Sequence, residues 1–226
     1  SWTEGNNLNT ARRILGGAGT QTAGLGFGGL SPGPTTVAST EEYGGTSWTN
    51  VNNMGTARYG LAGAGTQTAG LGFGGYQPPG SPPNGNSVAT EEYDGTNWTS
   101  GGNLSTGLYL ISGCGTQTAA LGFGGNLGTT TEEYNGTSWT SGGALNLGRS
   151  RAAAGGTQTA AAGFGGERNP SPGATNATEH YDGSSWVTSA NMATARLFTS
   201  GGKSAAQTSS LCVGGGTPPA SNATEE

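Results

Sequence analysis

The stretch Gly-Thr-Gln-Thr-Ala-Ala-Leu-Gly-Phe-Gly-Gly at residues 115–125, followed by Thr-Glu-Glu-Tyr-Asn-Gly-Thr-Ser-Trp-Thr at residues 131–140, decides the fold, because the chain is built from copies of it. One tryptophan marks each copy, and these tryptophans stand 41 to 50 residues apart, at Trp2, Trp48, Trp98, Trp139 and Trp186. A fixed period of this length is typical of a radial or stacked repeat array. We therefore expect one domain over residues 1–226.

Each copy contains four short segments with the features of β-strands. The first is rich in Ala and Gly, and a Thr-Gln-Thr turn joins it to the second. In the second segment bulky residues alternate with glycine, as in Ala-Gly-Leu-Gly-Phe-Gly at residues 23–28. This alternation predicts a strand with one bulky and one bare face. Because a bare face weakens a strand unless something packs on it, we expect the Leu and Phe side chains of one sheet to lie on the glycines of the next.

The third and fourth segments form a hairpin signal. Thr-Glu-Glu-Tyr leads into an Asp-Gly or Asn-Gly pair in most copies, and the short Ser-Trp-Thr segment follows. Such pairs supply the positive φ angles of a type I′ turn. No segment has helical periodicity. Four antiparallel strands per copy in five copies predict an all-β, five-bladed β-propeller with four-stranded blades.

The order of these signals resembles the kelch repeat: Gly-Gly after the second strand, then Tyr with the turn pair, then Trp. The resemblance covers essentially the whole chain and implies a kelch-like propeller. The chain begins in a fourth strand at Trp2 and stops in a third strand at residues 222–226. We therefore expect the N-terminal strand to close the last blade, which would remove both sheet edges. The alternative is that these five units belong to a longer tandem array.

The composition excludes several classes of protein. Only 9% of the residues are charged and the net charge is -5, so the chain has no polycationic surface for nucleic acid. No apolar run has membrane-spanning length, which argues against membrane insertion. The 47 glycines suggest low complexity, but aromatic residues at fixed repeat positions indicate a packed fold and not a disordered one.

An arginine precedes the first strand in four of the five copies. These residues are Arg12, Arg58, Arg149 and Arg196, and Leu108 takes the position in the third copy. In a propeller they would form a ring where the inter-blade loops meet the innermost strands, and the kelch resemblance implies that ligands bind on this face. Converging arginines can hold a carboxylate, sulfate or phosphate. In the alternative interpretation each arginine caps backbone carbonyls as part of the scaffold.

A recurring pair of acidic residues follows in the third strand. Adjacent strand residues face opposite ways, so the two acids of a pair cannot share a catalytic site. We expect solvated or cross-strand-paired glutamates, with one of each pair meeting a repeat arginine between blades. The single histidine, His180, has no apparent partners for catalysis or metal binding. We therefore predict no catalytic residues, no metal and no cofactor.

The copies differ most in the connection from the second to the third strand. It is long and Pro-rich in copies one, two and four, whereas the third copy has only Asn-Leu-Gly at residues 126–128. Variable loops on a constant scaffold often carry recognition. Tyr76, Gln77 and the Pro-rich residues 78–83 are the candidate ligand contacts in these loops. The alternative is an insertion that is tolerated and binds nothing.

The two phrases quoted first resemble repeats of virion-associated proteins from marine bacteriophages. That resemblance implies a tail-fibre or capsid-surface appendage, on a virion surface or otherwise extracellular, with a host-surface glycan or protein, or other virion subunits, as partners. The leading interpretation is a non-enzymatic binding or display module. A purely structural decoration or spacer domain is the first alternative, and a glycan-active enzyme is the second.

Overall fold

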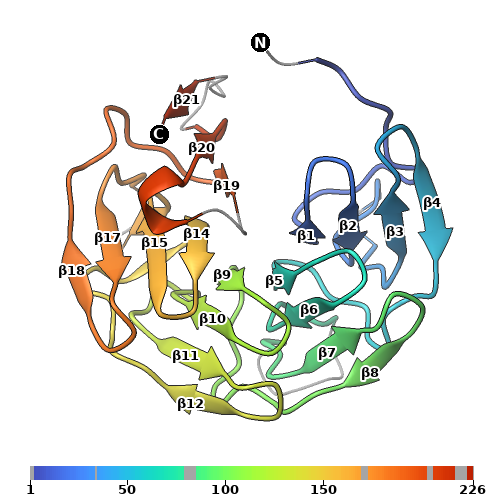
Figure 1. The fold of residues 1–226 in the computed structure, drawn as a ribbon, viewed down its shortest axis with the longest axis horizontal. Coiled ribbons are helices and arrows are strands. Elements are labelled where there is room, and N and C mark those ends of the chain that lie inside the picture. Colours follow the sequence, from blue (N-terminus) through green and yellow to red (C-terminus); the bar gives the residue numbers. More distant parts are fainter. Residues whose placement is uncertain are drawn as a thin grey trace.

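The computed structural model describes residues 3–33, 35–78, 85–168, 173–202, 206–216 and 223–225. The chain forms five small antiparallel sheets arranged around a common axis, and the first strand of each sheet lies nearest that axis (Figure 1). The prediction of an all-β, five-bladed propeller is confirmed, and the arrangement is consistent with kelch-like repeats.

The blades follow one another in chain order. Blade 1 contains β1 (Gly16–Gly19), β2 (Gly24–Phe27), β3 (Thr40–Tyr43) and β4 (Trp48–Val51). Blade 2 contains β5 (Ala62–Gly65), β6 (Gly70–Phe73), β7 (Thr90–Tyr93) and β8 (Trp98–Ser100). Blade 3 contains β9 (Ser112–Gly115), β10 (Ala120–Phe123), β11 (Thr131–Tyr134) and β12 (Trp139–Ser141). Blade 4 contains β14 (Ala153–Thr157), β15 (Ala160–Phe164), β17 (Thr178–Tyr181) and β18 (Trp186–Thr188).

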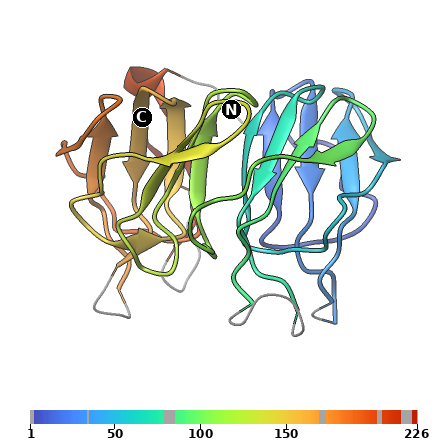
Figure 2. The same ribbon diagram turned by 90° about the horizontal axis from the view of Figure 1, so that it is seen from below.

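Blade 5 has three strands in the described part of the chain: β19 (Ser200–Gly201), β20 (Cys212–Val213) and β21 (Thr224–Glu225). A short 3-10 helix, η1 (Gln207–Ser209), lies between β19 and β20. A separate two-stranded sheet pairs β13 (Arg149–Ser150) with β16 (Glu167–Arg168) beside blade 4. In blades 1 to 4 the described parts of the connections between second and third strands lie on one face of the ring (Figure 2). We call this face, to which residues 30–33, 35–37, 76–78, 85–87, 126–129, 167–168 and 173–175 contribute, the loop face.

Neighbouring blades pack as the glycine alternation predicts. The fully buried ring of Phe27 in blade 1 lies on blade 2, so close that a methyl group at Gly72 would stand 2.9 Å from it. The same ring meets Trp98 edge to face, with 4.9 Å between centroids. Equivalent contacts join the phenylalanines of blades 2 and 3 to the tryptophans of blades 3 and 4. Each buried phenylalanine contributes about 2 kcal/mol of transfer free energy, so these contacts supply much of the cohesion between blades.

Hydrogen bonds add to this packing at each junction from blade 1 to blade 5. A glutamine in the turn after the first strand donates to two backbone carbonyls of the preceding blade: Gln67 Nε2 lies 3.1 Å from Gly24 O and 2.8 Å from Tyr43 O. Gln117, Gln158 and Gln207 repeat this pattern. Across the first junction the Tyr93 hydroxyl donates to Glu42 of the preceding blade at 2.8 Å. Each copy thus carries half of a junction on either flank.

The junction between blade 5 and blade 1, which we call the seam, lacks these ties in the part of the chain that the structure describes. Gln21, the counterpart of Gln67, is exposed and donates no hydrogen bond there. Trp48 Nε1 donates to Asn6 O at 3.2 Å, whereas the other described tryptophans donate to a threonine of the preceding blade. Val213 of blade 5 stands where the other blades have phenylalanine. Among the described residues, the seam is therefore the junction with the fewest such contacts.

Residues 3–10 pass blade 1 as the inter-blade connectors pass the other blades. Leu8 lies 3.8 Å from the position of a methyl group at Gly26, and Met54 lies 3.5 Å from the equivalent position at Gly72. This placement is the one expected for a chain leaving the fourth strand of blade 5. Trp2, which was predicted to form that strand, lies outside the described residues.

Candidate ligand-binding face

Each of the four repeat arginines forms an ion pair with the first glutamate of the third strand. The pairs are Arg12–Glu41, Arg58–Glu91, Arg149–Glu179 and Arg196–Glu225. In blade 2 the Arg58 Nη2 to Glu91 Oε1 distance is 2.9 Å, and Arg58 Nη1 donates to the carbonyls of Gly74 and Ala89. All four arginine side chains are 0% exposed. Their terminal nitrogens are thus bonded inside the scaffold.

This geometry corrects the expected roles of these residues. Glu41, Glu91, Glu179 and Glu225 each meet the arginine of their own repeat and not one across a blade junction. The arginines cap buried carbonyls, as the scaffold interpretation predicts, so we do not assign Arg12, Arg58, Arg149 or Arg196 to a ligand surface. Burial lowers the pKa of Arg58, and the charge of Glu91 opposes that change. A buried pair of this kind stabilises the fold only while both partners are present.

The third repeat lacks the arginine, so it shows how the glutamate of the third strand is placed without an ion-pair partner. Leu108 is buried in the arginine position, and Glu132 is completely buried without a cationic partner among the described residues. One oxygen of Glu132 accepts the Ser105 N–H at 2.8 Å, while Oε1 accepts no hydrogen bond in the described structure. Blade 3 therefore tolerates a carboxylate that the other blades neutralise.

Tyr76 belongs to a cluster of three tyrosines on the loop face. Its ring centroid lies 5.4 Å from that of Tyr59 and 5.6 Å from that of Tyr109, and the Tyr59 and Tyr109 centroids are 5.4 Å apart. Tyr59 and Tyr76 are also paired through their backbones, and all three side chains are partly exposed. Sequence reasoning missed Tyr59 and Tyr109, although each directly follows the arginine position of its repeat. We call these three residues the tyrosine cluster.

Gln77 is buried at the base of its loop. It is 8% exposed, and its backbone N–H donates to Gly85 O at 2.8 Å, which closes the base of the loop. Of the Pro-rich segment predicted at residues 78–83, residues 79–83 lie outside the described residues. Among the predicted loop contacts that are described, Tyr76 is partly exposed and Pro78 is exposed, whereas Gln77 is buried.

A belt of left-handed residues surrounds the axis near the loop face. Two positions after the arginine site, every blade has a positive φ: 55° at Ile14, 65° at Gly60, 57° at Leu110, 58° at Arg151 and 57° at Phe198. The backbone N–H groups of Gly60, Leu110 and Arg151 each donate to the carbonyl of the belt residue in the preceding blade, at 2.8 to 3.1 Å. L-residues pay about 1–2 kcal/mol for this conformation, so the inter-blade bonds hold the belt in place. Gly60 has no side chain because the Tyr109 ring would stand 2.4 Å from its Cβ.

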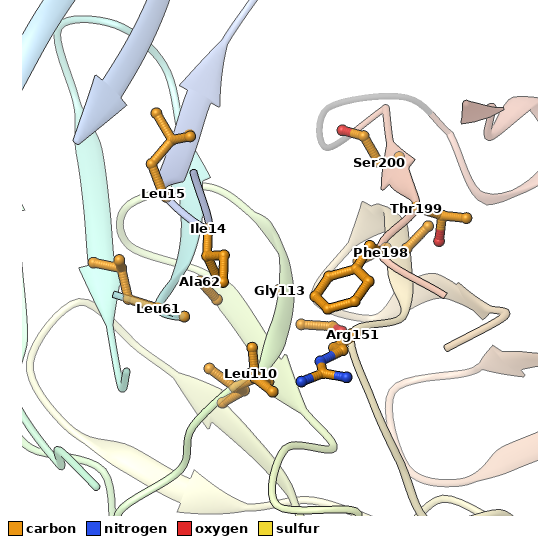
Figure 3. A pocket seen from close by; sticks show the side chains of 18 of the residues that line it. Ile14, Leu15, Leu61, Ala62, Leu110, Gly113, Arg151, Phe198, Thr199 and Ser200 are labelled. Atoms are coloured by element: carbon orange, nitrogen blue, oxygen red, sulfur yellow. The ribbon is translucent and has the colours of Figure 1, made fainter. Parts of the chain in front are cut away.

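The five belt residues line a cavity of about 890 Å³. Figure 3 shows Ile14, Leu61, Leu110 and Phe198 around it, with the Arg151 guanidinium beside the Phe198 ring. Arg13 also lines this cavity, and no acidic residue does so among the residues described. The wall is thus mainly apolar, with cationic groups as its charged members.

Arg151 connects the cavity to the tyrosine cluster. Its Nη1 donates to Glu167 Oε2 at 2.6 Å, and its guanidinium carbon lies 4.2 Å from the Phe198 ring centroid. Burial raises the pKa of Tyr109 and the neighbouring Tyr59 adds to this, whereas Arg151 opposes the rise. A cation held by both a carboxylate and an aromatic ring has a fixed orientation, so it can present its remaining donors to a ligand.

Comparisons with protein-family models and with curated proteins found no match for this chain. Among the residues that the structure describes, no helix is long and apolar enough to cross a membrane. The same residues contain no cluster of three or more His, Cys, Asp or Glu side chains that could hold a metal ion.

Proposed function

We propose that this protein is a non-enzymatic binding and display module that recognises a surface glycan through its loop face. The observation that carries the proposal is the tyrosine cluster. Tyr59, Tyr76 and Tyr109 come from two blades and one long connection, yet their rings meet at a partly exposed surface. Tyrosine combines a rigid apolar ring with a hydroxyl group, which is the combination that suits a ligand with both apolar and polar faces.

A sugar ring has this character, because its C–H groups form an apolar face and its hydroxyl groups form a polar rim. Stacked on the tyrosine cluster, such a ring would also reach the donors at the mouth of the adjacent cavity. The rigid scaffold supports this role, since Tyr59 and Tyr109 precede belt residues that are bonded from blade to blade. A rigid site loses little conformational entropy on binding.

We place this activity on a phage particle, at a virion surface that contacts the host. This setting rests on the resemblance of the repeat phrases to virion-associated proteins of marine bacteriophages. The main alternative is a structural decoration domain that contacts only other virion subunits. The scaffold contacts that recur in each repeat fit a binding module and a structural decoration domain equally well. A partly exposed aromatic cluster favours the binding module.

Glycan binding by the 226-residue chain tests the proposal directly. We expect an immobilised oligosaccharide set to identify at least one ligand, and Tyr76→Ala to weaken its binding about tenfold. The matched variant Tyr76→Phe keeps the ring and should retain most of the affinity. If no oligosaccharide binds and the chain is retained only by purified virions, the structural alternative replaces the proposal. Release of sugar from a bound glycoside would instead identify an enzyme.

A further inference from the structure

We infer that the ligand of the loop face is an acidic glycan, one that carries carboxylate or sulfate groups. This inference rests on the proposed function and concerns the same site. Its starting point is the distribution of charge. The net charge is -5, yet the cations of the described residues other than the buried repeat arginines lie at one end of the ring.

The repeat arginines are already used. Four of the eight Lys and Arg residues are 0% exposed at the side chain and bonded to glutamates. The three cations that remain in the described structure are Arg13, Arg151 and Arg168. Arg13 pairs with Leu30 and Arg168 with Arg149 through their backbones, at the bases of the connections that form the loop face. These three arginines therefore share the face of the tyrosine cluster.

Most of the acidic side chains are bonded to other residues of the fold or lie far from the cavity. Four glutamates pair with the repeat arginines, and Glu42, Glu92 and Glu133 accept hydrogen bonds from tyrosines of the next blade. Asp94 and Asp182 lie in hairpin turns at the opposite end of the blades and accept backbone N–H groups there. At the cavity mouth Glu167 binds Arg151 and fixes its orientation. The cavity itself is lined by two arginines and, among the described residues, by no acid.

Arg13 is the residue best placed to take a negative charge. Its side chain is exposed, it lines the cavity, and no carboxylate of the described residues forms an ion pair with it. Arg151 lines the same cavity. It also lies close enough to Tyr109 of the tyrosine cluster to oppose the rise in the pKa of that hydroxyl group. A sugar ring stacked on the cluster would thus bring an acidic substituent toward two guanidinium groups. Guanidinium binds carboxylate and sulfate oxygens through paired, charge-assisted hydrogen bonds.

Matched oligosaccharides test this inference with the 226-residue chain. The probes are sialyllactose against lactose, oligogalacturonate against its methyl ester, and sulfated carrageenan fragments against unsulfated agarose fragments. We expect at least one acidic probe to bind about tenfold more tightly than its neutral counterpart, with a preference that decreases as NaCl is raised. The carboxylated and sulfated pairs separate the two kinds of acid.

Two variants test the residues. Arg13→Gln should remove about tenfold of the affinity for the acidic probe and lower the affinity for the neutral probe much less, because Gln keeps hydrogen-bond donors but carries no charge. Arg13 is exposed and its side chain is not part of the scaffold. Arg151→Asn should act in the same direction, since Asn tolerates the left-handed backbone at this position. Asp182→Asn, at the far end of blade 4, is the charge control and should change nothing.

The outcomes separate the two proposals. Equal binding of acidic and neutral members that depends on Tyr76 would overturn the acidic preference and leave glycan recognition standing. An acidic preference that survives Arg13→Gln and Arg151→Asn would equally contradict this site. Failure of every probe, acidic and neutral, would remove glycan recognition itself.

Discussion

Replacing Gly63 with alanine tests how tightly the blades nest. A methyl group at this position in β5 would stand 2.4 Å from the Gly17 carbonyl oxygen and 2.8 Å from Phe27 Cζ, both in blade 1. One of these neighbours is backbone, so a strand must move by about 1 Å to restore an ordinary contact of 3.4 Å. Overpacking of this kind costs about 3 kcal/mol, and the better backbone entropy of alanine returns about 0.5–1 kcal/mol. We expect a net loss of about 2 kcal/mol.

Gly17 is the matched control, because it holds the equivalent position in β1 and faces the seam. A methyl group there would meet only the Leu25 carbonyl oxygen, at 3.5 Å. Gly17→Ala should therefore stabilise the protein by about 0.5 kcal/mol. The two variants should differ by about 2.5 kcal/mol in urea denaturation, which for a domain of this size is about 5–10 °C in Tm.

The comparison can refute the reasoning in either direction. A large loss at Gly17 would mean that blade 5 packs on blade 1 as tightly as blade 1 packs on blade 2, and the seam would not be a weak junction. No loss at Gly63 would mean that the blades are loosely packed and that the glycine alternation has another cause.

Four further predictions follow from the same contacts. Glu91→Gln should cost about 3–5 kcal/mol in urea denaturation because it leaves a buried arginine unpaired, whereas Glu132→Gln, which has no arginine partner, should be neutral or stabilising. Gln67→Ala should cost about 2 kcal/mol for two lost hydrogen bonds, while Gln21→Ala at the seam should stay within about 0.5 kcal/mol. Burial and the nearby Glu92 raise the pKa of Tyr134 from 10.0 to about 12, so its contribution to stability is complete below pH 10 and is lost as the pH rises through 12; Tyr134→Phe should reduce the alkaline fall seen in urea titrations between those values. In hydrogen exchange, amides of β20 and β21 should exchange before those of β9 and β10, and slower exchange in blade 5 would contradict a weak seam.

Most of the fold could be predicted because the strands and turns follow from residue patterns that span only a few positions in the sequence. The alternation of Phe27 with glycine gave both the strand and its packing partner. Turn pairs such as Asp94-Gly95 correctly marked the hairpins, but the predicted type I′ turn is wrong, because Gly95 has a positive φ and Asp94 does not. The weakness of the seam could not be read in the same way. It depends on Val213 replacing phenylalanine in one copy, and its effect appears only when blade 5 meets the Trp48 flank of blade 1.

The candidate site could be predicted only in part. The arginine repeats suggested an anion site, but a recurring charge cannot show by itself whether it faces a ligand or a buried partner such as Glu91. Tyr76 was identified from the variable loop. Tyr59 and Tyr109 were not, because they lie far from Tyr76 in sequence and join it only where two inter-blade connections meet the connection after β6. The positive φ of Ile14 and Leu110 likewise has no signal in residue type.

Because copies two to four each bring both halves of a junction, the duplication or loss of one of these units would leave the other junctions complete. The blade number of such a protein can therefore change in a single genetic event, without compensating substitutions elsewhere. What would change is the width of the opening at the axis, and with it the separation of Arg13, Arg151 and the rings beside them. A change in the number of units would therefore alter the size of ligand that fits this face without altering any side chain.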